Sequence, residues 1–330
     1  MSDPIFAALD ALASEAIDLP APPSLPPTIG ASEVAAVLGL SPWLSPYKLW
    51  AQLTGLMPRY GGGNGNLATR RGQILEPALR DWYAREAGIE LQPGPTLAES
   101  PWTRPDAPWQ AARPDGWNDT SLVEIKTTSG WEGWGPEESG LVPIHYATQV
   151  LWQQWVAAPR LPSLAETVVV AFDRYTDEIR VYRLPIRLDL AEKIARRVAA
   201  WWRLHIELAE PPQVDGSLAT REALSARYPV DFQPELDPSP ELVALVDDYR
   251  LASDLADDAL ATKERARNRL VAAIGPASGI RGLCTYRASK PRLSTDLEAV
   301  EKAHPGLLSP FQTPTLPTRT LRLKKDKSNG

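Results

Sequence analysis

Residues 113–126 read RPDGWNDTSLVEIK, and this stretch carries the strongest indication of the fold and its chemistry. Eight residues separate Asp115 from Glu124, and Lys126 follows two positions later. The residues at 121–127 predict a β-strand. Because side chains alternate along a strand, Glu124 and Lys126 should share one face of the sheet.

We expect this strand to form a hairpin with a strand at 109–112, turning near residues 116–119. Antiparallel pairing would then bring Asp115 beside Glu124. Two carboxylates in close proximity repel each other unless a proton or a cation lies between them. Mg²⁺ or Mn²⁺ prefers such oxygen ligands and can activate water for attack on a phosphodiester.

Each part of the pattern also has an ordinary structural explanation. Pro-Asp-Gly is a common turn sequence, and Glu-x-Lys on a strand is usually a solvated face. The combination is more specific, because the helical segment before it contributes a further carboxylate, Glu76.

The rest of the chain predicts an α/β fold, a mixed sheet flanked by helices. Helical spacing is found at 32–40, 46–56, 71–87, 144–157, 189–208 and 241–274, and strand patterns at 109–112, 121–127, 167–172 and 178–184. The last two strands read as a second hairpin.

Composition shifts predict four segments. An N-terminal arm (1–28) combines a short helix over 1–19 with a proline-rich linker. An α/β core (29–210) precedes a Pro- and Asp-rich linker (211–240) and an extension (241–330) with one long helix and small strands.

The bulk composition excludes several classes of protein. The net charge of −6 argues against a uniformly basic surface, although a local basic groove would suffice for nucleic acid. A single cysteine, Cys284, excludes internal disulfides and cysteine-rich metal sites. The three histidines have no ligand spacing. With no apolar run of membrane-spanning length and no signal-peptide pattern at the N-terminus, we expect a cytoplasmic protein.

Several short motifs make the chain recognisable. They are Ile29-Gly30-Ala31-Ser32-Glu33-Val34, Leu38-Gly39-Leu40-Ser41-Pro42-Trp43, Pro46-Tyr47-Lys48-Leu49-Trp50, Gly72-Gln73-Ile74-Leu75-Glu76-Pro77, Pro114-Asp115-Gly116, Glu124-Ile125-Lys126 and Tyr146-Ala147-Thr148-Gln149-Val150. Over about residues 29–157 the chain resembles the YqaJ-type viral recombinase family, related to phage lambda exonuclease, in the PD-(D/E)XK nuclease superfamily.

The resemblance implies a role for each matching residue. Asp115 and Glu124 would hold two Mg²⁺ or Mn²⁺ ions, helped by the Ile125 carbonyl. Lys126 would position the attacking water, and Glu76 would support the second cation or its water.

Gln149 would lie near the metal-bound water or the DNA backbone. Tyr146, Gln149 and Gln153 share one helix face by their spacing, which predicts a polar surface for DNA. The alternative is an ordinary polar face.

Ser32 matches a family position that contacts the terminal phosphate of DNA, and its alternative role is a helix N-cap. The expected upstream basic residue is absent, and Arg70 and Arg71 are candidates to replace it. The tryptophan-rich loop 131–135 could wedge between separating bases or simply pack.

The resemblance implies an exonuclease that degrades one strand of linear duplex DNA 5′→3′, leaving a 3′ single strand for recombination. It also implies a ring-shaped trimer and a single-strand annealing partner. Two alternatives stay open: a related nuclease acting as an endonuclease or on branched or single-stranded DNA, and a DNA-binding or assembly module without activity.

Overall fold

The computed structural model describes residues 27–59, 67–137, 139–231, 234–290, 293–311 and 319–324. The chain divides into two compact units, Met1–Arg227 and Tyr228–Gly330. The expected helix over 1–19, most of the proline-rich linker and the glycine-rich loop at 61–66 lie outside the described residues.

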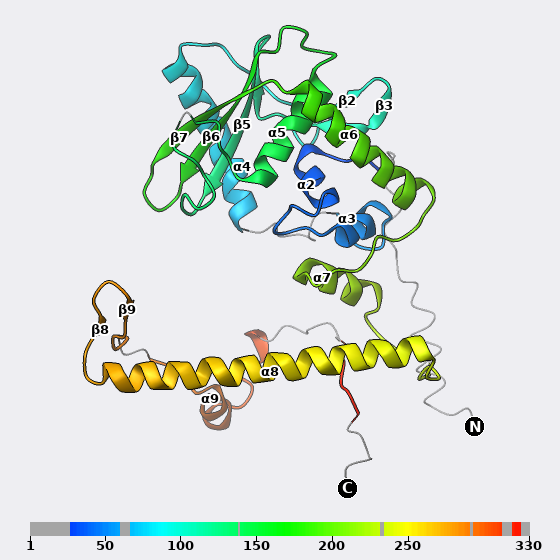
Figure 1. The fold of residues 1–330 in the computed structure, drawn as a ribbon. Helices are drawn as coiled ribbons and strands as arrows, with labels where there is room; N and C mark the ends of the chain where they lie inside the picture. Colours follow the sequence, from blue (N-terminus) through cyan, green and yellow to red (C-terminus); the bar gives the residue numbers. More distant parts are fainter. Residues whose placement is uncertain are drawn as a thin grey trace. The chain divides into compact units, whose positions relative to one another are not determined.

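A five-stranded mixed sheet forms the centre of the first unit (Figure 1). Its order is β1 (Gln92–Pro93), β4 (Gly116–Trp117), β5 (Ser121–Thr128), β6 (Glu166–Asp173) and β7 (Ile179–Pro185). β5 and β6 are parallel, and the other neighbours are antiparallel. The predicted mixed sheet and the β6–β7 hairpin are confirmed.

The predicted pairing of residues 109–112 with 121–127 is wrong. β3 (Ala107–Ala112) instead pairs with β2 (Trp102–Arg104) in a separate two-stranded sheet. The antiparallel partner of β5 is the two-residue strand β4, with Gly116 opposite Val123 and Trp117 opposite Leu122. The Asn118 side chain accepts backbone N–H bonds from the start of β5 and closes the turn between the two strands.

Helices cover both faces of the sheet. In chain order the helical elements of this unit are η1 (Ala31–Glu33), α2 (Val34–Val37), α3 (Pro46–Leu53), α4 (Leu67–Ala87), α5 (Ile144–Ala157), α6 (Leu188–Trp202), η2 (Arg203–Glu207) and α7 (Leu218–Arg227). α4 packs Leu79 and Tyr83 against one face of the sheet, and α5 packs Val150 against the other.

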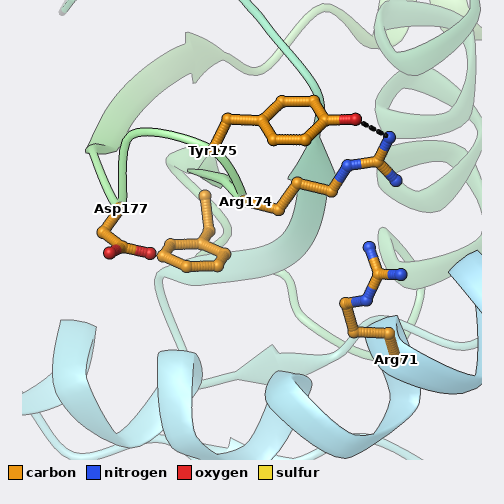
Figure 2. Close-up of a pocket in the computed structure, with 5 residues that line it drawn as sticks. Arg71, Arg174, Tyr175 and Asp177 are labelled. Carbon is orange, nitrogen blue, oxygen red and sulfur yellow. Dashed lines mark hydrogen bonds between the residues drawn. The ribbon is translucent and has the colours of Figure 1, made fainter. Parts of the chain in front are cut away.

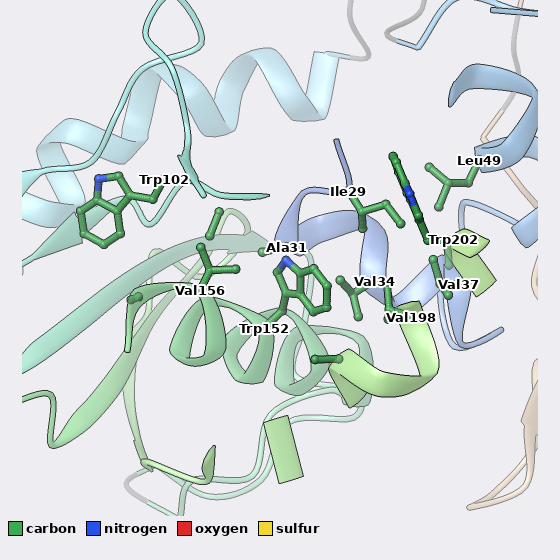
Figure 3. Packing of buried hydrophobic residues seen from close by; sticks show 14 of the residues in the cluster. Ile29, Ala31, Val34, Val37, Leu49, Trp102, Trp152, Val156, Val198 and Trp202 are labelled. Carbon is green, nitrogen blue, oxygen red and sulfur yellow. The ribbon is translucent and has the colours of Figure 1, made fainter. Parts of the chain in front are cut away.

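The largest core cluster lies where α5, α6 and the N-terminal segment meet (Figure 3). Trp152 is fully buried there, and its Nε1 donates to the Ala111 carbonyl at 3.0 Å. Ile29 bonds through its backbone to Trp109 and Ala111, which ties this N-terminal segment to β3.

The predicted linker at 211–240 contains a helix that the sequence reading missed. α7 packs Ala223 against Tyr47 and Trp50, and Thr220 donates a hydrogen bond to Ser45. The proline- and aspartate-rich flanks hid a short helical pattern, so the expectation of a continuous loop is wrong.

The second unit contains the expected long helix and small strands. α8 (Pro240–Ile274) begins at the N-cap Ser239 and ends at Gly275, whose φ of 55° the glycine accommodates. β8 (Gly279–Ile280), β9 (Cys284–Thr285), α9 (Leu297–Ala303) and η3 (Ser309–Phe311) follow. None of the helices described in either unit has the length and apolar character needed to cross a membrane.

Candidate active site

The β4–β5 turn fixes Asp115 at the edge of the site. Its backbone N–H donates to the Val123 carbonyl at 3.1 Å, and its Oδ2 accepts from the Ile125 N–H at 2.6 Å. Asp115 is therefore held against the backbone of β5 at the residue that follows Glu124. The two-residue strand β4, rather than the expected longer one, produces this placement.

Glu124 is the most enclosed carboxylate of the site, with 2% of its surface exposed. Lys126 Nζ and Gln149 Nε2 both donate to its Oε1, and Gln153 Nε2 donates to its Oε2 at 2.6 Å. β5 supplies the glutamate and the lysine on one face, while α5 supplies both glutamines one turn apart. Ile125 lies in the hydrophobic cluster on the opposite face.

Glu76 approaches from α4, where it is partly buried. Burial and the charge of Glu124 raise its pKa, while Arg80 and Lys126 oppose the shift. Arg80 lies one turn after Glu76, and its guanidinium donates to the Asp115 carbonyl at 3.3 Å. The sequence reading missed Arg80, although its i, i+4 spacing from Glu76 was a usable signal.

The site holds more negative charge than its single ammonium neutralises. Burial, with the charges of Glu124 and Glu76, raises the pKa of Asp115 well above its ordinary value, against the opposing effect of Lys126. Burial lowers the pKa of Lys126, but Glu124 and Asp115 outweigh it, so that the net pKa is raised. A lysine in this setting stays protonated at neutral pH.

The chemistry of this donor set fits Mg²⁺ or Mn²⁺. Carboxylate oxygens with raised pKa values are stabilised by a bound cation, and hard oxygen donors suit these two metals. Across the described residues, no three His, Cys, Asp or Glu side chains lie close enough together to hold an ion. The pair Asp115 and Glu124 would hold it, with water or phosphate oxygens as its further ligands.

Tyr146 lies beside the lysine. Lys126 Nζ lies 5.1 Å from its ring centroid, and the rings of His145, Trp134 and Trp43 lie 4.1, 5.5 and 6.5 Å away. Trp43 is 65% exposed and was not singled out from the sequence. It is the most exposed member of this aromatic group.

The tryptophan-rich loop is anchored by packing. Trp131 Nε1 donates to Glu178 at 2.8 Å, with the Arg180 guanidinium 4.0 Å from its ring centroid. Trp134 packs against Tyr182, with 5.1 Å between ring centroids. These contacts match the packing alternative for residues 131–135.

Ser32 is exposed inside η1. The N-cap position belongs to Gly30, whose N–H donates to Glu33 Oε2 at 2.8 Å, so the N-cap alternative for Ser32 is wrong. Arg70 is exposed on α4, and Arg71 lines a pocket near the carboxyl ends of β5 and β6.

Comparisons with known proteins relate part of the chain to viral recombinases and exonucleases. The family model of the YqaJ-like viral recombinase domain matches residues 26–160. The "Uncharacterized protein YqaJ" of Bacillus subtilis (strain 168) is 25% identical over 205 residues, which cover 61% of this chain and 60% of that protein. The chain thus matches less than two thirds of the length of that relative.

Solved structures with similarity include an alkaline exonuclease from Laribacter hongkongensis, 24% identical with a TM-score of 0.43. The match covers 55% of this chain and 90% of that one. A phage related exonuclease from Haemophilus somnus 129PT is 12% identical with a TM-score of 0.39, over 56% of this chain and 96% of that one. Over residues 26–160 the chain is therefore similar to the YqaJ-like viral recombinase domain.

Proposed function

We propose that this protein is a divalent-metal-dependent exonuclease that degrades one strand of linear duplex DNA. The observation that carries the proposal is the arrangement around Glu124. Its carboxylate accepts hydrogen bonds from Lys126, Gln149 and Gln153 and lies next to Asp115. The match to a viral recombinase family supports the same conclusion.

Each residue has a role that follows from its environment. Asp115 and Glu124, with the Ile125 carbonyl, would hold the cation, and Glu76 would hold a second cation or its water. A bound Mg²⁺ or Mn²⁺ supplies charge neutralisation at the phosphodiester and lowers the pKa of a water molecule.

Lys126 acts as a charged donor. Because its pKa is raised, the ammonium keeps its proton and can orient the attacking water and stabilise negative charge developing on the phosphate. Gln149 and Gln153 hold the Glu124 carboxylate in place by donating to both of its oxygens. Neutral amides do this without adding charge to the site.

The finer features of the activity form part of the proposal. Digestion would proceed 5′→3′ and leave a 3′ single strand for recombination, with Ser32 near the terminal phosphate. The proposal also includes a ring-shaped trimer around DNA, an annealing protein that binds the exposed strand, and a cytoplasmic location. These rest on the family resemblance.

Digestion of an end-labelled linear duplex beside a covalently closed circle tests the proposal. With Mg²⁺ we expect the linear duplex to shorten from its ends and the circle to stay intact. Duplexes carrying a 5′-phosphate or a 5′-hydroxyl then report on how the end is bound. A cut circle would identify an endonuclease instead.

Lys126→Ala tests the role of the site directly. Removing a donor that stabilises transition-state charge typically costs about 10²–10³-fold in rate, and DNA affinity should change by only a few fold. Lys193→Ala, an exposed lysine on α6, is the matched control. An inactive wild-type protein that still binds DNA would indicate a binding module.

A further inference from the structure

A positively charged site lies near the proposed active centre. Arg71 of α4 and Phe172, Arg174, Tyr175 and Asp177 of the β6–β7 hairpin line a pocket of about 460 Å³. Figure 2 shows the guanidinium groups of Arg71 and Arg174 approaching each other from the helix and from the hairpin.

Arg174 is held in place but is not saturated with hydrogen bonds. Its NH2 donates to the Tyr175 hydroxyl at 3.0 Å, and its guanidinium carbon lies 4.7 Å from the Tyr175 ring centroid. Its Nε is buried without a hydrogen-bond partner in the described part of the chain. A buried donor of this kind is costly unless a ligand accepts from it.

The charges around the pocket favour an anion. The lining carries two guanidinium groups and one exposed carboxylate, Asp177, and neither arginine forms an ion pair within the described residues. Arginine binds phosphate well because its planar fork of donors matches the oxygens of the group.

Two elements, β5 and α4, each contact or supply both the pocket and the proposed active centre. The backbone N–H of Arg174 donates to the Thr128 carbonyl at 3.2 Å. Thr128 follows Lys126 by two residues on β5, a distance of about 7 Å along the strand. Arg71 precedes Glu76 by five residues on α4, about 7.5 Å along the helix axis. Both estimates correspond to about two nucleotides, since stacked nucleotides rise about 3.4 Å each.

We infer that Arg71 and Arg174 form a subsite for a DNA backbone phosphate about two nucleotides from the phosphodiester that is cleaved. This inference rests on the proposed function, and it adds Arg174 of the β6–β7 hairpin to the residues proposed to contact DNA. The subsite holds the strand in register with the carboxylate cluster, while Phe172 and Tyr175 offer aromatic surface to the adjoining nucleotide.

Binding of a fluorescent duplex in Ca²⁺, measured by anisotropy, tests the subsite. Arg71→Ala and Arg174→Ala should each weaken binding about tenfold or more, because each removes charge-assisted hydrogen bonds. The slope of log affinity against log salt should fall by about 0.7–0.9 when one phosphate contact is lost. Arg85→Ala, an exposed arginine on the same helix, is the matched control.

The double variant shows whether the two arginines share one phosphate. Independent contacts would give losses that multiply to within about twofold, whereas a shared phosphate gives a clear departure from that product. Asp177→Asn is expected to tighten binding by removing the rim carboxylate. Its φ of 58° suits asparagine, so this variant keeps the hairpin and serves if an arginine variant fails to fold.

Duplexes with a single uncharged methylphosphonate identify the phosphate. The wild type should lose affinity at one position near the cleaved bond, and Arg174→Ala should be insensitive there. Equal affinities of wild type and both arginine variants on every duplex would overturn the subsite alone. A wild-type protein that binds no DNA would overturn the proposed function as well, and competition only by a free 5′-mononucleotide would assign the pocket to product instead of to the strand.

Discussion

Asp115→Asn should make the metal-free protein more stable while removing its activity. Burial and the charges of Glu124 and Glu76 raise the pKa of Asp115. A carboxyl whose folded-state pKa is raised contributes stability that is complete below the ordinary pKa and is lost as the pH rises through the raised value. Asparagine keeps an oxygen for the Ile125 N–H and carries no charge at any pH.

The size of the gain follows from the neighbouring charges. Asp115 is repelled by Glu124 and Glu76 and attracted by Lys126, which leaves the equivalent of one like-charge pair. At roughly 5 Å and an effective dielectric constant of about 20, such a pair costs about 3 kcal/mol. Asp115 keeps some solvent exposure, which screens the interaction, so we expect about 1–2 kcal/mol. For a unit of the size of Met1–Arg227, this gain raises the melting temperature by roughly 2–8 °C.

Thermal unfolding followed by circular dichroism measures this gain. In EDTA the difference between Asp115→Asn and wild type should grow as the pH rises above the ordinary pKa of an aspartate, about 3.8. Added Mg²⁺ should shrink it, because the cation binds and stabilises the folded wild type. Asp119→Asn removes an exposed carboxylate from the same hairpin turn and is the control. An Asp115→Asn variant no more stable than wild type in EDTA at high pH would refute the reasoning.

Three further predictions concern the site and the core. Gln153→Leu removes the 2.6 Å hydrogen bond to buried Glu124. It should lower the rate of DNA cleavage and reduce the free energy of urea unfolding by about 1–2 kcal/mol. An unchanged cleavage rate would argue against a positioning role for Gln153. Trp152→Phe loses the hydrogen bond to the Ala111 carbonyl and part of a fully buried ring. The free energy of urea unfolding should therefore fall by about 2 kcal/mol. An unchanged free energy of unfolding would contradict the place of Trp152 in the core. The rate of DNA cleavage should rise from acid to alkaline pH. The raised pKa values of the Asp115 and Glu76 carboxyls weaken cation binding at low pH, while Lys126 keeps its charge. A cleavage rate that falls between pH 6 and 9 would contradict this prediction.

The strongly periodic segments could be predicted from the sequence. The strand expected over 121–127 is Ser121–Thr128, and the helix expected over 144–157 is Ile144–Ala157. Both are long enough for their spacing of apolar residues to be unambiguous. The sequence predicted a mixed sheet but not which strands are parallel, and the structure pairs β5 with β6 in parallel.

The parts that were missed are short or depend on tertiary contacts. β4 has only two residues, too few to show any alternation, and its pairing depends on the backbone bond from Asp115 to Val123. α7 lies between proline-rich flanks and is stabilised by packing on α3. For Tyr146 the sequence predicted only a helix face shared with Gln149 and Gln153, and its contact with Lys126 depends on how α5 packs against β5.

A calorimetric titration of Mn²⁺ into the wild type and into Asp115→Asn, without DNA, tests the central claim most directly. The wild type should bind the ion and release protons, since the carboxyls with raised pKa values must ionise on binding. Asp115→Asn should bind at least about tenfold more weakly, in line with the loss of a metal ligand. A flat titration of the wild type, or equal affinities of the two proteins, would contradict a metal-dependent nuclease centre at Asp115 and Glu124.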